Sequence, residues 1–217
     1  MITRRDYLAT AGALGAGLLA GCAGLGGNGG SSVDVETVES MPTPVRGDAD
    51  ADVTVMVFED FACPHCATFS TEVAPKIFEN YASQGTIRYE HHDFPIPVSE
   101  TWSWAAANAA RSVQDTVGEQ AFFEYAHDLF ANQGEYVNQG DAGYDFLGST
   151  AADHGADAET VVRAAKGGKY DPVLKADRQT GADMGLDGTP EVYVNGEATD
   201  GYDYETVRAA IESARSA

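Results

Sequence analysis

Cysteine and lysine are scarce in this chain. Its 217 residues include three cysteines, Cys22, Cys63 and Cys66, too few for a small domain held together mainly by disulfides. There are four lysines, and 13 basic residues in total face 34 acidic ones, which gives a formal net charge of −21. Because nucleic acid binding needs a basic surface, this charge excludes a nucleic-acid-binding protein.

Strongly apolar runs are short. The run of residues 9–21 is rich in Gly and Ala and falls below the ~20 strongly apolar residues of a membrane-spanning helix. Hydrophobic residues nevertheless make up 43% of the chain and aromatic residues 10%, which excludes an acidic disordered protein. We predict one compact domain with appendages. Its acidic, lysine-poor surface is typical of a halophilic protein, because high salt screens the repulsion between carboxylates.

The first 21 residues have the composition of an export signal. Arg4 and Arg5 precede the short apolar run, as basic residues do in such signals. The stretch TRRDYL at residues 3–8 resembles the twin-arginine signal. LAGC at residues 19–22 resembles a lipobox, in which cleavage leaves Cys22 as a lipidated N-terminus. We therefore predict a domain that is exported and lipid-anchored on the extracytoplasmic face of the cell membrane, with a mature charge of −22.

A linker is predicted between this signal and the folded domain. The stretch AGLGGNGGSS at residues 23–32 is rich in Gly and Ser and is typical of a flexible tether. We predict a signal at residues 1–21, a lipidated N-terminus with a linker at 22–47, and the folded domain at 48–217.

The folded part begins with a strand–helix–strand pattern. Residues 53–58, VTVMVF, predict a buried strand, and residues 87–91 predict a second one. Between them, apolar residues recur at helical spacing from Cys66 to Tyr81, with a kink expected at Pro75. Such a unit is most simply a right-handed parallel crossover.

A helical insert follows, at about residues 96–184, and then two strands and a closing helix. Asp157 is expected to cap one insert helix and Gly167 to end it, and Asn195-Gly196 predicts a hairpin turn. The order βαβ, insert, ββα defines an α/β protein. The expected elements are helical stripes at 102–117 and 122–130, helices at 141–154, 157–166 and 171–184, strands at 191–194 and 197–200, and a helix at 204–214.

Cys63 and Cys66 carry the chemistry of the chain. The motif Cys63-Pro64-His65-Cys66 follows a strand and opens a helix, where free N–H groups and the helix dipole favour a thiolate on Cys63. His65 supplies a possible positive charge beside that thiolate. Both effects stabilise the reduced form and make the disulfide more oxidising. Cys66, one turn later, is placed to resolve a mixed disulfide.

Three motifs together resemble the DsbA-type disulfide oxidoreductases of the thioredoxin superfamily. They are FEDFACPHC at residues 58–66, HDFP at 92–95 and GTPE at 188–191, and the resemblance covers about residues 45–215. It implies a thioredoxin fold with a helical insertion, a redox-active Cys63–Cys66 disulfide, and a cis-proline loop in which Thr189 and Pro190 shape the client groove. It also implies a monomer that needs no cofactor, with exported thiol proteins as clients and a membrane redox partner.

One position departs from the family pattern. The family often has a buried carboxylate six residues before the first cysteine, where this chain has Val57. Glu59 and Asp60 are the candidates to replace it as proton acceptor for Cys66.

Other interpretations of the cysteine pair stay open. A structural disulfide would close only a tiny loop and would restrain the unfolded chain little. A metal site could use the cysteines with His65 and His91 or His92, although adjacent histidines on a strand point to opposite faces. We predict introduction of disulfides into exported proteins; the alternatives are a reductase for cytochrome or copper-site assembly, or an extracytoplasmic metal-delivery protein.

Overall fold

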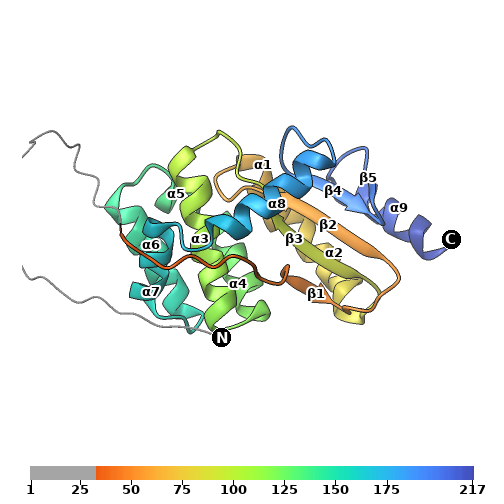
Figure 1. The fold of residues 1–217 in the computed structure, drawn as a ribbon. Helices are drawn as coiled ribbons and strands as arrows, with labels where there is room; N and C mark the ends of the chain where they lie inside the picture. Colours follow the sequence, from red (N-terminus) through yellow and green to blue (C-terminus); the bar gives the residue numbers. More distant parts are fainter. Residues whose placement is uncertain (1–32) are drawn as a thin grey trace, which may run out of the picture. The chain divides into compact units, whose positions relative to one another are not determined.

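The computed structural model describes residues 33–217, which form one unit built on a five-stranded sheet. The strand order is β1-β3-β2-β4-β5, with helices on both faces and a group of helices beside the sheet (Figure 1). The sheet strands are β1 (Val45–Gly47), β2 (Thr54–Glu59), β3 (Arg88–Asp93), β4 (Glu191–Val194) and β5 (Glu197–Ala198).

The predicted βαβ unit is confirmed. Strands β2 and β3 are parallel, and their register pairs Val57 with His91 and Glu59 with Asp93. Because side chains alternate along a strand, Val55, Val57 and Glu59 share one face of β2. Phe58 lies on the opposite face, where it packs with Phe94 and Tyr193. The sheet is therefore buried on both faces, and β2 is its central strand.

The helix after the cysteine motif is interrupted as predicted. It consists of α1 (Pro64–Thr68), a π-helical turn η1 (Phe69–Val73) and α2 (Ala74–Asn80). Pro75 lacks an N–H group and cannot complete the usual hydrogen bond to the preceding turn, so the irregular segment lies directly before it. The short 3₁₀ helix η2 (Ala82–Gln84) ends at Gly85, whose φ of 65° lies in the left-handed region.

The helical insert is confirmed between β3 and β4. Asp157 caps α7 as predicted, accepting a hydrogen bond of 2.8 Å from the Thr160 N–H. The predicted stop at Gly167 is wrong by one residue, because Gly168 is the left-handed residue that ends this helix, with φ 66°. The insert comprises α3 (Glu100–Thr116), α4 (Glu119–Ala131), α5 (Gln133–Tyr136), α6 (Asp141–Asp153), α7 (Ala158–Gly167) and α8 (Asp171–Asp183).

The C-terminal ββα unit is also confirmed. Asn195 and Gly196 both have positive φ, as a tight hairpin turn requires, but β5 ends at Ala198, earlier than predicted. The closing helix α9 (Tyr204–Arg215) is capped by Asp203.

The predicted boundary between linker and domain is wrong. Residues 45–47 form the edge strand β1, antiparallel to β3, and the Val38 N–H donates a hydrogen bond to the Lys169 carbonyl. The end of the predicted linker is thus held to the domain by backbone hydrogen bonds. It was assigned to the linker because its short, proline-containing sequence has no pattern typical of a strand. The predicted export signal, Cys22 and the glycine-rich tether lie outside the described residues. Among residues 33–217, no helix has the length and apolarity needed to cross a bilayer.

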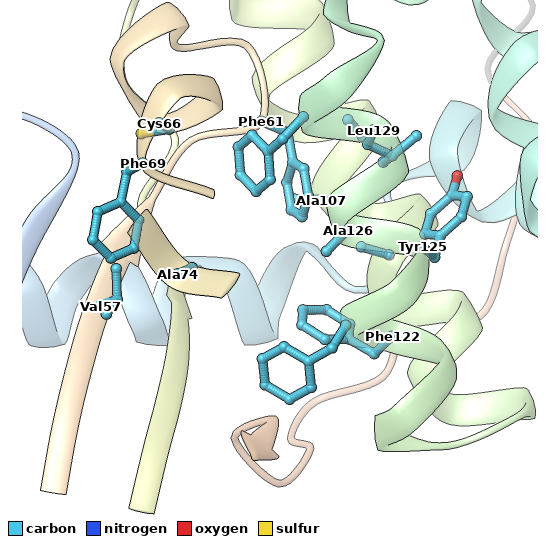
Figure 2. Packing of buried hydrophobic residues seen from close by; sticks show 14 of the residues in the cluster. Val57, Phe61, Cys66, Phe69, Ala74, Ala107, Phe122, Tyr125, Ala126 and Leu129 are labelled. Atoms are coloured by element: carbon cyan, nitrogen blue, oxygen red, sulfur yellow. The ribbon is translucent and has the colours of Figure 1, made fainter. Parts of the chain in front are cut away.

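The main core lies between the sheet and the insert. Figure 2 shows Cys66, Phe69 and Val57 on one side of this core and Phe122, Ala126 and Leu129 of α4 on the other. Phe61, which follows β2, lies between the two sides and stacks on Phe130 with ring centroids 4.7 Å apart. The loop that carries the cysteine motif is therefore packed against the insert.

Candidate active site

Cys63 and Cys66 lie at the start of the helix that follows β2. Cys63 is the N-cap of α1 with extended backbone angles, and Pro64 occupies the first turn, where its missing N–H costs nothing. Both cysteines are free thiols, with exposed fractions of 3% for Cys63 and 0% for Cys66. The helix start therefore presents Cys63 at its positive end and encloses Cys66 one turn further on.

The surroundings of Cys63 stabilise its thiolate. The side-chain hydrogen bond from Cys66 lowers the pKa of Cys63 most; burial opposes it, and the backbone N–H groups of Cys66 and His65 add to it, bringing the pKa to about 5. The Thr189 hydroxyl, a buried group with no other partner among the described residues, also favours the thiolate. A pKa of about 5 favours the thiolate of Cys63 at neutral pH, and the thiolate is the form in which a cysteine acts as a nucleophile.

Cys66 has the opposite character. Burial raises the pKa of Cys66 well above its usual range, and the hydrogen bond to Cys63 and the charge of Glu59 act in the same direction. The Asp60 N–H donates a weak hydrogen bond to Cys66 Sγ at 3.4 Å. Two cysteines three positions apart are therefore held in different protonation states, which is the requirement for one thiol to attack and the other to resolve.

The His65 ring does not contact the thiolate directly. The ring is exposed, and its Nδ1 lies 3.2 Å from the Tyr202 hydroxyl in the loop before α9. What His65 contributes to the low pKa of Cys63 is its backbone N–H. Pro64 is exposed beside it, so the two middle residues of the motif form the outer surface of the site.

The loop before β4 meets the cysteine motif from the side. The Thr189–Pro190 peptide bond is cis, and the Thr189 carbonyl oxygen lies 3.5 Å from Cys63 Sγ. Pro190 is buried, whereas Thr189 is partly exposed. The structure thus brings Cys63 and Cys66 together with the Thr189–Pro190 loop, although Cys63 and Thr189 are 126 residues apart in the sequence.

Two carboxylates lie beneath the pair, although Val57 does not supply one. Glu59 and Asp60 are 2% and 1% exposed. Burial raises the pKa of Asp60 to about 6, against hydrogen bonds donated by the Ile96 and Ala62 N–H groups. Glu59 accepts a hydrogen bond of 3.0 Å from the Ser70 hydroxyl and lies 3.3 Å from His91. Its carboxylate is therefore the one whose charge acts on Cys66.

A buried charge network continues from Glu59, and the sequence analysis missed it. His91 lies between Glu59 and Asp93, at 3.3 Å from each, and Asp93 is paired with Arg111 of α3 at 2.6 Å. Arg111 has no exposed side-chain surface and also pairs with Asp177 of α8. The signal in the sequence was the run RYEHHD in a central strand, since charged residues there must be paired.

His91 is held in its charged form. Burial by itself lowers the pKa of His91, but hydrogen bonds to Asp93 and Glu59 raise it to about 9. Its neighbour His92 lies on the other face of the strand, stacked on Phe58. The two histidines therefore face opposite ways, as predicted. Within residues 33–217, no group of three or more His, Cys, Asp or Glu is arranged so that it could hold a metal ion.

Comparisons with known proteins agree with this geometry. A family model described as Thioredoxin matches residues 39–213. Disulfide bond formation protein D of Bacillus subtilis is 27% identical over 174 residues, covering 78% of this chain and 75% of that protein. The crystal structure of oxidised BdbD from Bacillus subtilis superimposes with a TM-score of 0.73 at 24% identity, covering 84% of this chain and 100% of that one. Chlamydia trachomatis DsbA gives a TM-score of 0.69 at 19% identity, with coverages of 84% and 97%.

A different kind of relative is much longer. The Na(+)/H(+) antiporter NhaA 1 of Salinispora arenicola is 32% identical over 177 residues, covering 78% of this chain. The chain spans only 24% of that protein.

Proposed function

This chain belongs to the thioredoxin family, and on that premise we propose that it is a protein thiol–disulfide oxidoreductase that introduces disulfides into exported proteins. The observation that carries the proposal is the asymmetry of the pair: the pKa of Cys63 is lowered to about 5 and that of Cys66 is raised. A purely structural disulfide does not require its two cysteines to differ in pKa. The name of the Bacillus subtilis relative, disulfide bond formation protein D, supports the same activity.

The reaction follows from the two sulfur environments. A client thiolate attacks Cys63 Sγ in the disulfide form, the Cys63–Cys66 bond breaks, and its electron pair moves to Cys66, which takes up a proton. A second client thiolate then attacks the client sulfur of the mixed disulfide, and Cys63 leaves as a thiolate. The client is oxidised by two electrons, and the enzyme holds them as a dithiol.

Glu59 is our proposed proton acceptor for Cys66. Its carboxylate is buried, and its charge raises the pKa of the Cys66 thiol. It accepts a hydrogen bond from the Ser70 hydroxyl rather than from backbone N–H groups. The Asp60 oxygens, in contrast, accept hydrogen bonds from Ala62 and Ile96. Glu59 thus takes the role that the family assigns to a position occupied here by Val57.

The client binds along the loop of Thr189 and Pro190 in this proposal. The loop lies against Cys63, as shown by the contact with the Thr189 carbonyl, and an extended client segment gains backbone hydrogen bonds there. No bound cofactor takes part, because the dithiol itself carries the electrons. A disulfide-bearing membrane partner re-oxidises the pair, and the lipid on Cys22 keeps the domain beside that partner outside the cytosol, where disulfides persist.

The test adds a reduced client peptide with two cysteines to the wild type in its disulfide form, and adds the same peptide in its own disulfide form to each reduced single-cysteine variant. Wild-type protein in the disulfide form should oxidise the peptide. Cys66→Ser should accumulate a mixed disulfide on Cys63, because the resolving thiol is gone, whereas Cys63→Ser should form none. A mixed disulfide on Cys66 in the Cys63→Ser protein, together with none on Cys63 in the Cys66→Ser protein, would reverse the assignment of roles.

A further inference from the structure

A cavity of about 570 Å³ opens behind the active site, away from the Thr189–Pro190 loop. It lies between α4 on one side and η1 and α2 on the other, and its floor reaches β2 and β3. Such a volume holds many water molecules, since each occupies about 30 Å³ in the liquid.

The cavity connects solvent with Glu59, the carboxylate whose charge raises the pKa of Cys66. Among its lining residues, Glu79, Ser83 and Glu124 are exposed, whereas Glu59 and His91 on the floor are each only 2% exposed. The proposed proton acceptor therefore has Cys66 on one side and a solvent-connected space on the other.

His91 fixes the carboxylate at that boundary. Its Nδ1 lies 3.3 Å from Glu59 and its Nε2 3.3 Å from Asp93, and Asp93 is held in turn by Arg111. The ring is packed between Phe61 and Phe122, with ring centroids 5.7 and 5.1 Å away. His91 thus has one orientation, in which its positive charge is directed at Glu59.

We propose that the proton released by Cys66 leaves through this cavity by way of Glu59, and that His91 is the positioning residue that holds the Glu59 carboxylate in place for this transfer. The proposal rests on the function proposed above. In re-oxidation by a disulfide, Cys63 first forms a mixed disulfide with the oxidant. Cys66 then gives its proton to Glu59 as its sulfur attacks Cys63, the oxidant's thiolate leaves with two electrons, and the proton passes from Glu59 to cavity water.

The groups that face this path come from every element around it. Tyr89 and His91 of β3 and Ser70 of η1 face Glu59. The titratable and charged groups at the mouth are Arg46, Glu79, Glu124, His127, Asp128 and His154. His91 and the Ser70 hydroxyl both contact the Glu59 carboxylate, so the loss of His91 removes one of the contacts that hold this carboxylate in place.

The test follows the closure step alone. The reduced protein is mixed with oxidised glutathione, the reaction is quenched with acid, and mass spectrometry measures the glutathionylated intermediate over time from pH 5 to 9. We expect His91→Gln to slow conversion of the intermediate at least tenfold, because the proton acceptor is no longer held in place and proton transfer contributes on the order of 10²-fold or more. The rate of attack by Cys63 should stay unchanged.

His92→Gln is the matched control. His92 lies between two carboxylates like His91, 3.2 Å from Glu90 and 3.4 Å from Asp177, but on the other face of the sheet and outside the cavity. The His92→Gln protein should close its disulfide at the wild-type rate, even if its melting temperature is lower. A slowing of closure in His92→Gln equal to that in His91→Gln would overturn the proposal, because a general loss of packing would then explain both.

Two further variants test the proposal if the His91→Gln protein does not fold. Ser70→Ala removes a hydrogen bond to Glu59 and should slow closure. Ala126→Leu fills part of the cavity and should slow closure as well. Closure at the wild-type rate in both variants would overturn the proposed route. The end point of client dithiol oxidation reports separately on the proposed function. If the wild type does not oxidise the client dithiol, the proposed function is wrong. If the wild type oxidises it but the variants close their disulfide at the wild-type rate, only the proposed proton route is wrong.

Discussion

At the scale of single residues, the site depends on the different environments of two identical side chains. Cys63 is surrounded by hydrogen-bond donors at a helix start, whereas Cys66 is enclosed and lies near a carboxylate. The thiolate on Cys63 stabilises the reduced protein, because it is lost when the disulfide forms.

We predict that alkylation of Cys63 in the reduced protein has its pH midpoint at about 5. The lowered pKa also has a consequence for stability. A folded-state pKa below the unfolded value of about 8.5 stabilises the reduced fold fully above that value, and the gain disappears as pH falls through about 5. The difference in melting temperature between the reduced wild type and Cys63→Ser should therefore shrink from pH 8.5 to pH 4. An alkylation midpoint near 8.5 would contradict the environment described for Cys63.

At the scale of elements, the active site depends on how the insert is fastened to the sheet. Arg111 of α3 pairs with Asp93 at the end of β3 and with Asp177 of α8, and all three side chains are buried or nearly so. Burial by itself raises the pKa of Asp93, but the charge of Arg111 and the bond to His91 lower it below its usual value. Asp93 also holds His91, so the same ion pairs support the residues behind Cys66.

Arg111→Met should lower the free energy of unfolding by about 3 kcal/mol or more, because it leaves the buried Asp93 and the half-buried Asp177 without their guanidinium partner. The measurement is urea unfolding of the disulfide form at pH 7. Arg163→Met, at an exposed position on α7, is the control and should change stability by less than about 0.5 kcal/mol. A loss in Arg111→Met no larger than in this control would show that the network contributes nothing to stability.

The elements differ in how far the sequence predicts them. Strands β2, β3 and β4 were found because β-branched runs bounded by turns have few other solutions, and α7 because Asp157 is a strong cap. Edge strand β1 was missed, since three residues, VRG, carry no periodicity and pair only because β3 offers a free edge. The cysteine roles followed from spacing, but the His91 network did not, because its members come from β2, β3, α3 and α8.

At the scale of the whole molecule, charge is the dominant feature. The net charge of −21 places many carboxylates on a domain of this size, and buried pairs such as Arg111–Asp93 account for few of them. Their mutual repulsion is long-ranged at low salt, where the Debye length reaches ~30 Å at 0.01 M, and is screened at molar salt.

We predict that the melting temperature rises steadily from 0.01 M to molar KCl. The control is Arg111→Met, in which the salt response should persist because it arises from exposed carboxylates rather than from the buried pairs. A melting temperature that stays constant over this range would contradict a halophilic protein.

Membrane association is predicted to depend on one residue. Cys22→Ser should move the full-length protein from the membrane fraction to the soluble fraction or the medium, because LAGC is the proposed lipidation site. Mass spectrometry of the wild type should show the added lipid. A variant that stays in the membrane, together with a wild type that carries no lipid mass, would contradict lipid anchoring.

The reduction potential of the Cys63–Cys66 couple tests the proposed function most directly. The protein is equilibrated at pH 7 against a series of reduced and oxidised glutathione, and its dithiol fraction is measured. Because the Cys63 thiolate is strongly stabilised, we predict a potential well above the value of about −270 mV for thioredoxin. His65→Ala should leave the potential unchanged, because the backbone N–H that acts on Cys63 remains, and a lower value would show that the His65 ring contributes. A wild-type potential at or below −270 mV would contradict the oxidase and make the protein a reductase.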